Sequence, residues 1–465
     1  MTSDTVLTQK DTQRRDLVLQ GNLWRAILQI GTPLALYQSL NQLFRLLDTM
    51  MASHISAKSV SAVAYLGQIN MMLAAVGGGL AVGASIKVSE AYGAGDYELV
   101  KQRVSTLFAF CGILGLCAFA IIPFTGILLR MANTPAEFMS EGTLYFNIGL
   151  AGLVFKFFNN GYIAIERARG NAGRILWLNL ASIIMKLSTT AYFVYVRGCG
   201  ITMIAVTSVL SDSVITAAGI FELSKKNGIF GFRMHSVKFT GNVAPPMLKI
   251  SFPVMVEKVA FSFGKVVVNS MSTAYGALTV GALGISNNIG GITTNPQNGY
   301  QEAGSSVISQ NIGAGQQKRA LQAFKILSVV NLVVGALGYC FTMFFLPQIA
   351  GLFASGDVAF AKLIKSIYVF EAVGSIPLGL CSSVTALLYS FGYTRLTLLI
   401  NFCRVFVFRV PLLWALQEFT SLGSRSVGIV MMASNVLVSL FAVIICVFVV
   451  RRICWNENIV FWGKE

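Results

Sequence analysis

Charged residues are scarce in this sequence, and this excludes a fold whose surface faces mostly water. Asp, Glu, Lys and Arg make up 12% of the 465 residues, whereas soluble globular domains carry about 25%. Hydrophobic residues make up 55% of the chain, and the mean hydropathy is +0.69. The composition therefore predicts a protein embedded in a lipid bilayer.

Residues and motifs on which many enzymes depend are also few. The sequence has only the histidines His54 and His235, and its eight cysteines form no CxxC pair. It contains no GxxxxGK(S/T) phosphate loop, no HExxH motif and no GxSxG turn. These absences disfavour an ATP-driven pump, a zinc site, a disulfide framework and a hydrolase. We expect no catalytic residue, no metal and no cofactor, and an intramembrane enzyme acting on lipid stays a minor hypothesis.

Long apolar runs are abundant. A run of about 18 or more apolar residues is a candidate transmembrane helix. The candidate spans are Ile27–Ala52, Val63–Val88, Ser105–Leu128, Leu144–Ile165, Ile175–Val196, Ile201–Leu223, Ile250–Tyr275, Val280–Ile308, Ile326–Phe353, Leu363–Phe391, Leu396–Leu416 and Val427–Val450. Their length favours helices over the short alternating strands of a barrel. The sequence therefore predicts an all-α polytopic membrane protein of twelve helices.

The net charge of +16 indicates how the chain is oriented in the membrane and does not indicate a nucleic-acid partner. Lys and Arg concentrate in the tails and the even-numbered loops, which the positive-inside rule places in the cytoplasm. The odd-numbered loops hold only Lys58, Arg130, Arg197, Lys362 and Arg425. We therefore expect a multi-pass protein of the plasma or inner membrane with both termini cytoplasmic.

The two halves of the chain repeat one design. Adding 220 to Pro33 and Gly79 gives Pro253 and Gly299, and the same step carries Gly93-Ala94-Gly95 onto Gly313-Ala314-Gly315. The expected parts are a cytoplasmic tail (1–24), a first six-helix lobe (25–223), a cytoplasmic linker (224–249), a second lobe (250–450) and a second tail (451–465). Parallel repeats of this kind are typical of secondary transporters.

Helices two and eight carry breaks at matching positions, Gly77–Gly79 and Asn295–Gly299. Glycine and proline weaken or omit backbone hydrogen bonds, which lipid cannot replace, so such interruptions point to a binding region. Close helix packing through glycine is the alternative for helix two. For helix eight, the polar residues around Pro296 favour a water-lined cavity.

Several segments together resemble the multidrug and toxic compound extrusion (MATE) family over nearly the whole chain. They are Pro33, Asp48-Thr49-Met50, Tyr92–Asp96, Ser251-Phe252-Pro253 with Glu257, Gln310–Gly315, Ser390–Arg395 and Arg409–Leu413. The resemblance implies two six-helix lobes in a V shape and export driven by inward flow of protons or sodium. It also implies a small organic substrate, and we expect a monomer in the bilayer.

The first lobe holds the candidates for ion coupling, because a charge in mid-bilayer requires a partner or a purpose. Asp48 matches the acidic residue of the family's first helix, which the resemblance makes a proton or sodium acceptor. The sequence departs from the family at Arg45 and Lys186, where relatives often have Asn, and at Thr190, where many have Asp. Arg45 and Lys186 either pair with Asp48 and Asp212, favouring proton coupling, or line a cavity for anionic substrates; snorkelling to an interface is the third hypothesis.

The second lobe holds the candidates for a substrate or cation cavity. Glu257 matches a glutamate common in the family's seventh helix, and a structural salt bridge is the alternative interpretation. The remaining candidates are Lys258, Asn288, Asn295, Asn298 and Glu371. Arg404 and Arg409 are expected to pair with acidic groups or helix carbonyls as structural elements.

The leading hypothesis is an antiporter that exports amphipathic organic compounds, cationic drugs or metabolites, by alternating access in exchange for protons or sodium. The alternative is a flippase or exporter of lipid-linked or anionic substrates in the same superfamily. The basic residues Arg45, Lys186 and Lys265 keep this alternative open.

Overall fold

A computed structural model describes residues 7–55, 57–131, 136–225, 228–354, 357–457 and 459, and leaves out the side chains of 44–65, 68, 131, 136–141 and 277. All regular elements in these residues are helical. The long helices coincide in order with the twelve predicted spans, so the prediction of an all-α polytopic fold is confirmed.

Contacts divide the chain into two compact units. The first contains the described residues up to Asp16 together with Leu43–Val259, and the second contains Leu17–Gln42 together with Ala260–Glu465. The division therefore falls inside the first and seventh long helices, α2 (Leu23–Ile55) and α9 (Ala244–Ser272). The lobe boundaries predicted from the sequence, 25–223 and 250–450, stay a prediction.

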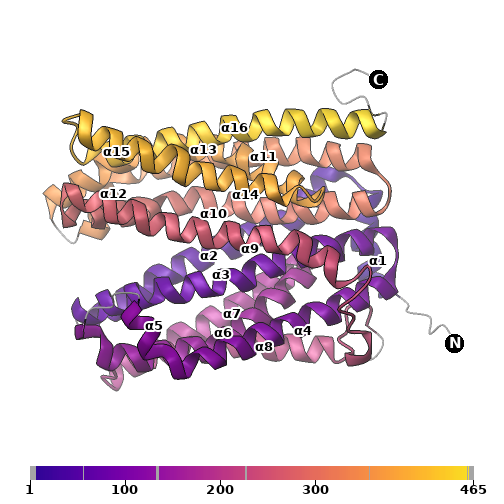
Figure 1. Ribbon diagram of the computed structural model, residues 1–465, viewed down its shortest axis with the longest axis horizontal. Coiled ribbons are helices and arrows are strands. Elements are labelled where there is room, and N and C mark those ends of the chain that lie inside the picture. Colours follow the sequence, from indigo (N-terminus) through magenta and orange to yellow (C-terminus); the bar gives the residue numbers. More distant parts are fainter. Residues whose placement is uncertain are drawn as a thin grey trace. The chain divides into compact units, whose positions relative to one another are not determined.

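The first unit is a helical bundle whose members lie side by side (Figure 1). Its elements, besides its parts of α2 and α9, are α1 (Gln9–Leu19, shared with the second unit), α3 (Ala57–Ala94), α4 (Tyr97–Ile121), η1 (Ile122–Phe124), α5 (Thr125–Met131), α6 (Ala136–Ala168), α7 (Ala172–Ala191), η2 (Tyr192–Val196), α8 (Ile201–Leu223) and η3 (Met234–Ser236). Helix α6 packs against α3, α4 and α8. Its core includes the fully buried Phe146, Tyr92 and Tyr162.

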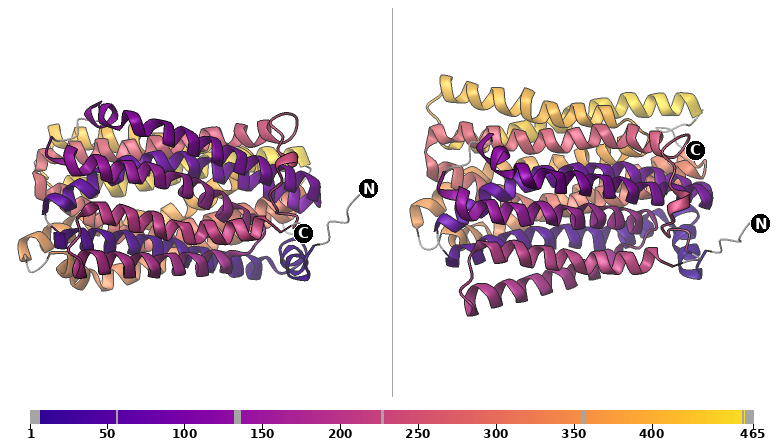
Figure 2. Two further views of the ribbon diagram at one scale, coloured as in Figure 1. Left: turned by 90° about the horizontal axis from the view of Figure 1, so that it is seen from below. Right: turned by 60° about the horizontal axis from the view of Figure 1, so that its bottom comes forward.

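The second unit is built in the same way, and the further views show its long helices side by side (Figure 2). Its own elements are η4 (Thr273–Tyr275), α10 (Ala277–Gly313), α11 (Gln317–Phe344), α12 (Leu346–Ala354), α13 (Val358–Ser390), α14 (Thr394–Phe402), η5 (Cys403–Arg409), α15 (Val410–Phe419) and α16 (Arg425–Glu457). Helix α13 packs against α10, α11 and α16. The central position of α13 explains why it buries more of its surface than the other membrane spans found in the described residues.

Nine helices among the described residues are long and apolar enough by themselves to cross a membrane. The predicted spans in α9 and α10 fall short of this criterion, and a large part of α2 lies outside the residues searched. Helix α10 reads NNIGGITTNPQNGYQE in its middle, and α9 carries Lys249, Glu257, Lys258 and Lys265. Polar residues in a spanning helix face protein or water rather than lipid, so these helices are the ones expected to surround a transport path.

Each unit contains a helix crossing at which a glycine of the internal repeat touches the backbone of another helix. A Cβ at Gly79 of α3 would lie 2.5 Å from the Cα of Met255 on α9, and a Cβ at Gly299 of α10 would lie 2.4 Å from the nitrogen of Ala35 on α2. Each member of the first pair stands 220 residues from a member of the second. The structure thus favours close packing as the role of both glycines, and both crossings follow the internal repeat.

The expected interruptions of helices two and eight are absent in the described backbone. Helix α3 runs without a break through Gly77–Gly79, and α10 continues through Pro296. The amide of Gln297 donates to the backbone oxygens of Asn331 at 3.4 Å and Ser375 at 3.1 Å, so it ties α10 to α11 and α13. Gln297, next to Pro296, therefore stabilises helix packing. The sequence had predicted a water-lined cavity here.

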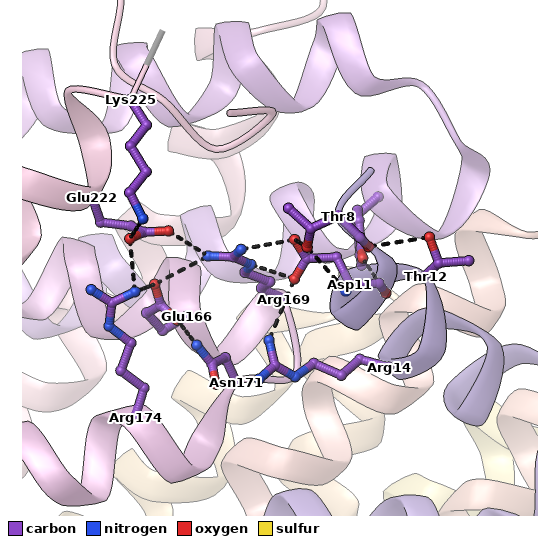
Figure 3. A network of polar contacts seen from close by, with 11 residues as sticks. Thr8, Asp11, Thr12, Arg14, Glu166, Arg169, Asn171, Arg174, Glu222 and Lys225 are labelled. Carbon is purple, nitrogen blue, oxygen red and sulfur yellow. Dashed lines mark hydrogen bonds and ion pairs between the residues drawn. The ribbon is translucent and has the colours of Figure 1, made fainter. Parts of the chain in front are cut away.

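Helix α1 is held to the first unit by a buried ionic network (Figure 3). The guanidinium of Arg169 donates to both carboxylate oxygens of Asp11, at 2.6 and 2.8 Å, and to Glu222 at 3.0 Å. The Tyr92 hydroxyl donates to the Asp11 carbonyl at 3.1 Å. Burial alone raises the pKa of Asp11, but Arg169 and the Thr8 hydroxyl hold this pKa below its ordinary value. The network therefore favours the ionised carboxylate.

We expect Gly299→Ala to destabilise the protein. The added methyl group would overlap the backbone of α2 at Ala35, and separating two packed helices costs about 1–3 kcal/mol. Thermal unfolding of the purified protein measures the effect. Gly284→Ala is the matched control on the same helix, because a Cβ at Gly284 would have no atom of a neighbouring element within 4 Å. Equal melting temperatures for the two variants would contradict the close crossing.

We expect Asp11→Asn to lower the free energy of unfolding at neutral pH by about 1.5–3 kcal/mol, because the buried Arg169 guanidinium loses one of its carboxylate partners and keeps Glu222. Since the folded pKa of Asp11 is lowered, the stabilisation is complete above the ordinary aspartate pKa of about 3.9 and disappears as pH falls through the folded value. The difference between wild type and variant should shrink accordingly in melting curves at decreasing pH.

Asp16→Asn is the control for this measurement. Asp16 lies on the same helix, half-buried, with no hydrogen bond or ion pair to another described residue. Its replacement should change stability by less than about 0.5 kcal/mol. A loss of stability as large as that of Asp11→Asn would show that any negative charge on α1 stabilises the fold equally.

Candidate functional site

The first unit brings together two of the predicted coupling residues, Lys186 and Asp212. Lys186 lies on α7 and is 4% exposed, while Asp212 lies on α8 and is half-buried. The ammonium groups of Lys186 and Lys156, the latter on α6, both act electrostatically on the Asp212 carboxylate. Three packed helices therefore each contribute one charged group to a single cluster in the membrane span.

The helix that carries Asp212 is fixed at this level by neutral hydrogen bonds. The buried amide of Asn159 donates to the Asp212 carbonyl at 2.8 Å and accepts from the Thr216 hydroxyl at 2.8 Å. The Ser182 hydroxyl of α7 donates to the Ser211 carbonyl at 2.7 Å. These bonds use the backbone of Asp212 and not its carboxylate, which interacts electrostatically with the two lysines. Asn159 was missed in the sequence, because one amide in an apolar helix gives no periodic signal.

Thr190 lies one turn beyond Lys186 on α7 and is buried. Its hydroxyl is 2.7 Å from that of Thr207 on α8, and the Thr207 hydroxyl also donates to the Ile204 carbonyl at 3.1 Å. This pair joins two helices, which favours a packing role. Arg45 and Asp48 lie in α2, but their side chains are outside the described part of the structure.

The predicted cavity residues on α10 separate into two groups. The Asn288 side-chain oxygen accepts from the Gln42 amide of α2 at 2.9 Å. Asn295 lies two turns further along the same face, and its buried amide nitrogen makes no hydrogen bond to any described residue. Asn298 is exposed. The structure thus adds Gln42 to the amide-lined face of α10 that holds Asn288 and Asn295.

The remaining predicted residues lie on α9 and α13. Glu257 is buried at 7% exposure and Lys258 is half-buried, both in the part of α9 that belongs to the first unit. Glu371 of α13 is buried in the second unit and accepts a short hydrogen bond from the Ser286 hydroxyl of α10. The second-lobe candidates therefore fall in different units.

Arg404 and Arg409, expected to pair with acidic groups or helix carbonyls, instead donate to side chains of α16. Arg404 donates to the Asn435 side-chain oxygen at 2.8 and 3.2 Å, and Arg409 donates to the same oxygen at 3.1 Å. Arg409 also donates to the Ser434 hydroxyl at 3.1 Å. The expectation was wrong because the helix turns by an irregular step between the two arginines, in the π-helical segment η5.

Comparisons with known proteins agree with this architecture. A family model described as MatE matches residues 33–193 and 253–415, more than half of the chain. The "Probable multidrug resistance protein YoeA" of Bacillus subtilis is 22% identical over 430 residues, 89% of this chain and 92% of that protein. The "FAD transporter" of Shewanella oneidensis is 21% identical over 419 residues, 88% of this chain and 90% of that protein.

The fold is also found among solved structures. The "Crystal structure of MATE in complex with MaL6" superposes with a TM-score of 0.90 at 20% identity, covering 96% of this chain and 99% of that one. The likeness extends over both halves of the chain and all its long helices. The chain therefore belongs to the MatE family, the multidrug and toxic compound extrusion transporters, and is a multi-pass membrane transporter rather than an enzyme.

Proposed function

We propose that the protein is a secondary active antiporter, which exports amphipathic organic compounds by alternating access in exchange for protons. The observation that carries the proposal is the cluster of Lys186, Lys156 and Asp212 in the membrane span of the first unit. Membership of the MatE family and the multidrug resistance relatives support export as the direction of transport.

The cluster favours protons over sodium as the coupling ion. A sodium site needs several oxygen ligands and an excess of negative charge, whereas two ammonium groups already face the one carboxylate of Asp212. Protonation of Asp212 would leave two like charges facing each other on α6 and α7. This repulsion gives the lobe two electrostatic states that depend on one proton, as coupling requires.

Asp48 stays part of the proposal through the family resemblance. It lies on α2, which the resemblance makes the helix of the ion acceptor, and a carboxylate in a desolvated place can bind and release a proton near neutral pH. Thr190, in contrast, is proposed as a packing residue, because its hydroxyl is already bonded to Thr207.

The cargo proposed first is a cationic drug or metabolite; two relatives are described as probable multidrug resistance proteins, which supports a drug as cargo. The second candidate is a compound that carries an anionic group. It is favoured by the arginine pair on η5 and by the relative described as an FAD transporter.

We expect ethidium to accumulate less in cells that express the protein than in cells that do not. A protonophore should abolish the difference, because it removes the proton gradient, while sodium-free buffer should leave it unchanged. Asp212→Asn and Asp48→Asn should each reduce the efflux rate about tenfold or more, since neither amide can exchange a proton. Asp16→Asn should transport at the wild-type rate.

Membrane insertion of each variant is checked by the amount of protein in the membrane fraction. Efflux that stops in sodium-free buffer but survives the protonophore would replace protons by sodium as the coupling ion. Inserted protein that moves no ethidium under either gradient would exclude cationic cargo and direct the assay to anionic compounds.

Thr190→Val should keep protonophore-sensitive efflux within about twofold of wild type. The variant loses one buried hydrogen bond, but the Thr207 hydroxyl keeps its bond to the Ile204 carbonyl, so the cost is about 1 kcal/mol. Efflux and melting temperature are measured on the same preparation. Loss of coupling in a normally folded Thr190→Val protein would restore Thr190 as a coupling residue.

A further inference from the structure

The π-helical segment η5 places two arginines where an ordinary helix would separate them. Arg404 and Arg409 are five residues apart, near the middle of the span Thr394–Phe419. In an α-helix, with 3.6 residues per turn, such residues point about 140° apart. In a π-helix, whose hydrogen bonds join residues five apart, they lie one above the other. The segment therefore directs both guanidinium groups to one side.

Both guanidinium groups converge on one neutral atom. The Asn435 side-chain oxygen accepts from Arg404 at 2.8 and 3.2 Å and from Arg409 at 3.1 Å. The other hydrogen-bond acceptor is the hydroxyl of Ser434, which is also neutral. Two like charges in the membrane span thus share one amide oxygen, an arrangement that costs free energy unless an anion balances it.

The nearby carboxylate does not supply this balance by direct contact. Glu371 acts electrostatically on both arginines, but its hydrogen bond comes from Ser286, and among the described residues it forms no ion pair with either arginine. One carboxylate faces two guanidinium groups, and Lys265 acts on it as well. The cluster therefore carries an excess of positive charge.

An aromatic ring lies beside the arginines. The guanidinium carbon of Arg404 is 5.2 Å from the centre of the Phe261 ring of α9, and the Lys265 ammonium is 5.0 Å from the same centre. Exposure falls from Lys265, which is exposed, through the half-buried Arg404 to Arg409 at 3%. Two cations therefore lie beside one aromatic ring, and the three cations range from an exposed to a buried position in the second unit.

We propose that Arg404 and Arg409 bind the carboxylate or phosphate group of the transported compound, and that Phe261 packs against its apolar or aromatic body. Arginine presents paired donors that match both anions, which explains why two guanidinium groups are held here. The proposal rests on the transport function proposed above and names its substrate class as amphipathic compounds with an anionic group. The anion takes the place on the arginines that the Asn435 oxygen occupies.

The test is binding of fluorescein, an aromatic carboxylate dye, to the purified full-length protein in phosphatidylcholine nanodiscs without any ion gradient. Fluorescence anisotropy should show saturable binding that Arg404→Gln weakens about tenfold or more, because a charge-assisted hydrogen bond is lost. Arg425→Gln, at the exposed start of α16, is the matched control and should bind as wild type does. Wild-type protein without saturable binding would overturn the proposal.

Asn435→Asp separates ligand binding from a purely structural role of the arginines. It places a carboxylate between the two guanidinium groups, so it should raise the melting temperature and remove fluorescein binding. If the variant melts higher and binds the dye as tightly as wild type, the arginines serve only to join η5 to α16 and the proposal is wrong.

Competition distinguishes a solute from a lipid headgroup as the source of the anion. Benzoate should displace fluorescein, which supports the solute. Displacement by phosphatidylglycerol in the nanodisc but not by benzoate would overturn the proposal in favour of a lipid site. Ethidium efflux in cells is measured separately. Binding with this variant pattern in a protein that moves no ethidium supports the anion site and excludes cationic cargo, while ethidium efflux without anion binding supports the antiporter and overturns the anion site.

Discussion

The structure depends on the high free-energy cost of a polar group that meets hydrocarbon without a partner. Within each unit, several described polar side chains of the spanning helices answer that cost by bonding across helices. Asn159 holds α8 to α6, and Gln297 holds α10 to α11 and α13. The same bonds fix the helices that carry Asp212 and Glu371. The bonds that pack the helices therefore also position the functional residues. We assign transport to charged side chains of these spans.

The internal repeat shows which backbone features occur in both halves of the chain. The glycine crossings at Gly79 and Gly299 use the same position of the repeat, and the turns at Gly95 and Gly315 both have positive φ, 80° and 74°. A side chain at either crossing would push two backbones apart, so steric exclusion alone is enough to preserve these glycines. Backbone geometry is thus the part of the design that the two halves share.

Sequence reasoning reached the helices, their order and the repeat, because long apolar runs and matching glycines are local signals. It also identified Lys186 and Asp212, since a charge inside an apolar span stands out by itself. It could not place the partner of Arg404, because the α-helical period of 3.6 residues puts Arg404 and Arg409 on different faces and only the π-helical step unites them. It also read the run around Pro296 as a break, although α10 continues through this proline and the Gln297 amide donates to α11 and α13.

Helices α8 and α16 each carry a serine followed by a polar residue, and the two helices differ in the charge of that residue. Helix α8 carries Ser211-Asp212, while α16 carries Ser434-Asn435, and in each unit the preceding span supplies at least one cation that faces this position. With an acid, the cluster of the first unit opposes one carboxylate to two ammonium groups, and under the proposed function it changes its charge by binding a proton. With an amide, the cluster of the second unit stays positive and attracts an anionic group. A duplicated fold can therefore divide its work between ion coupling and cargo binding by replacing a carboxylate with an amide.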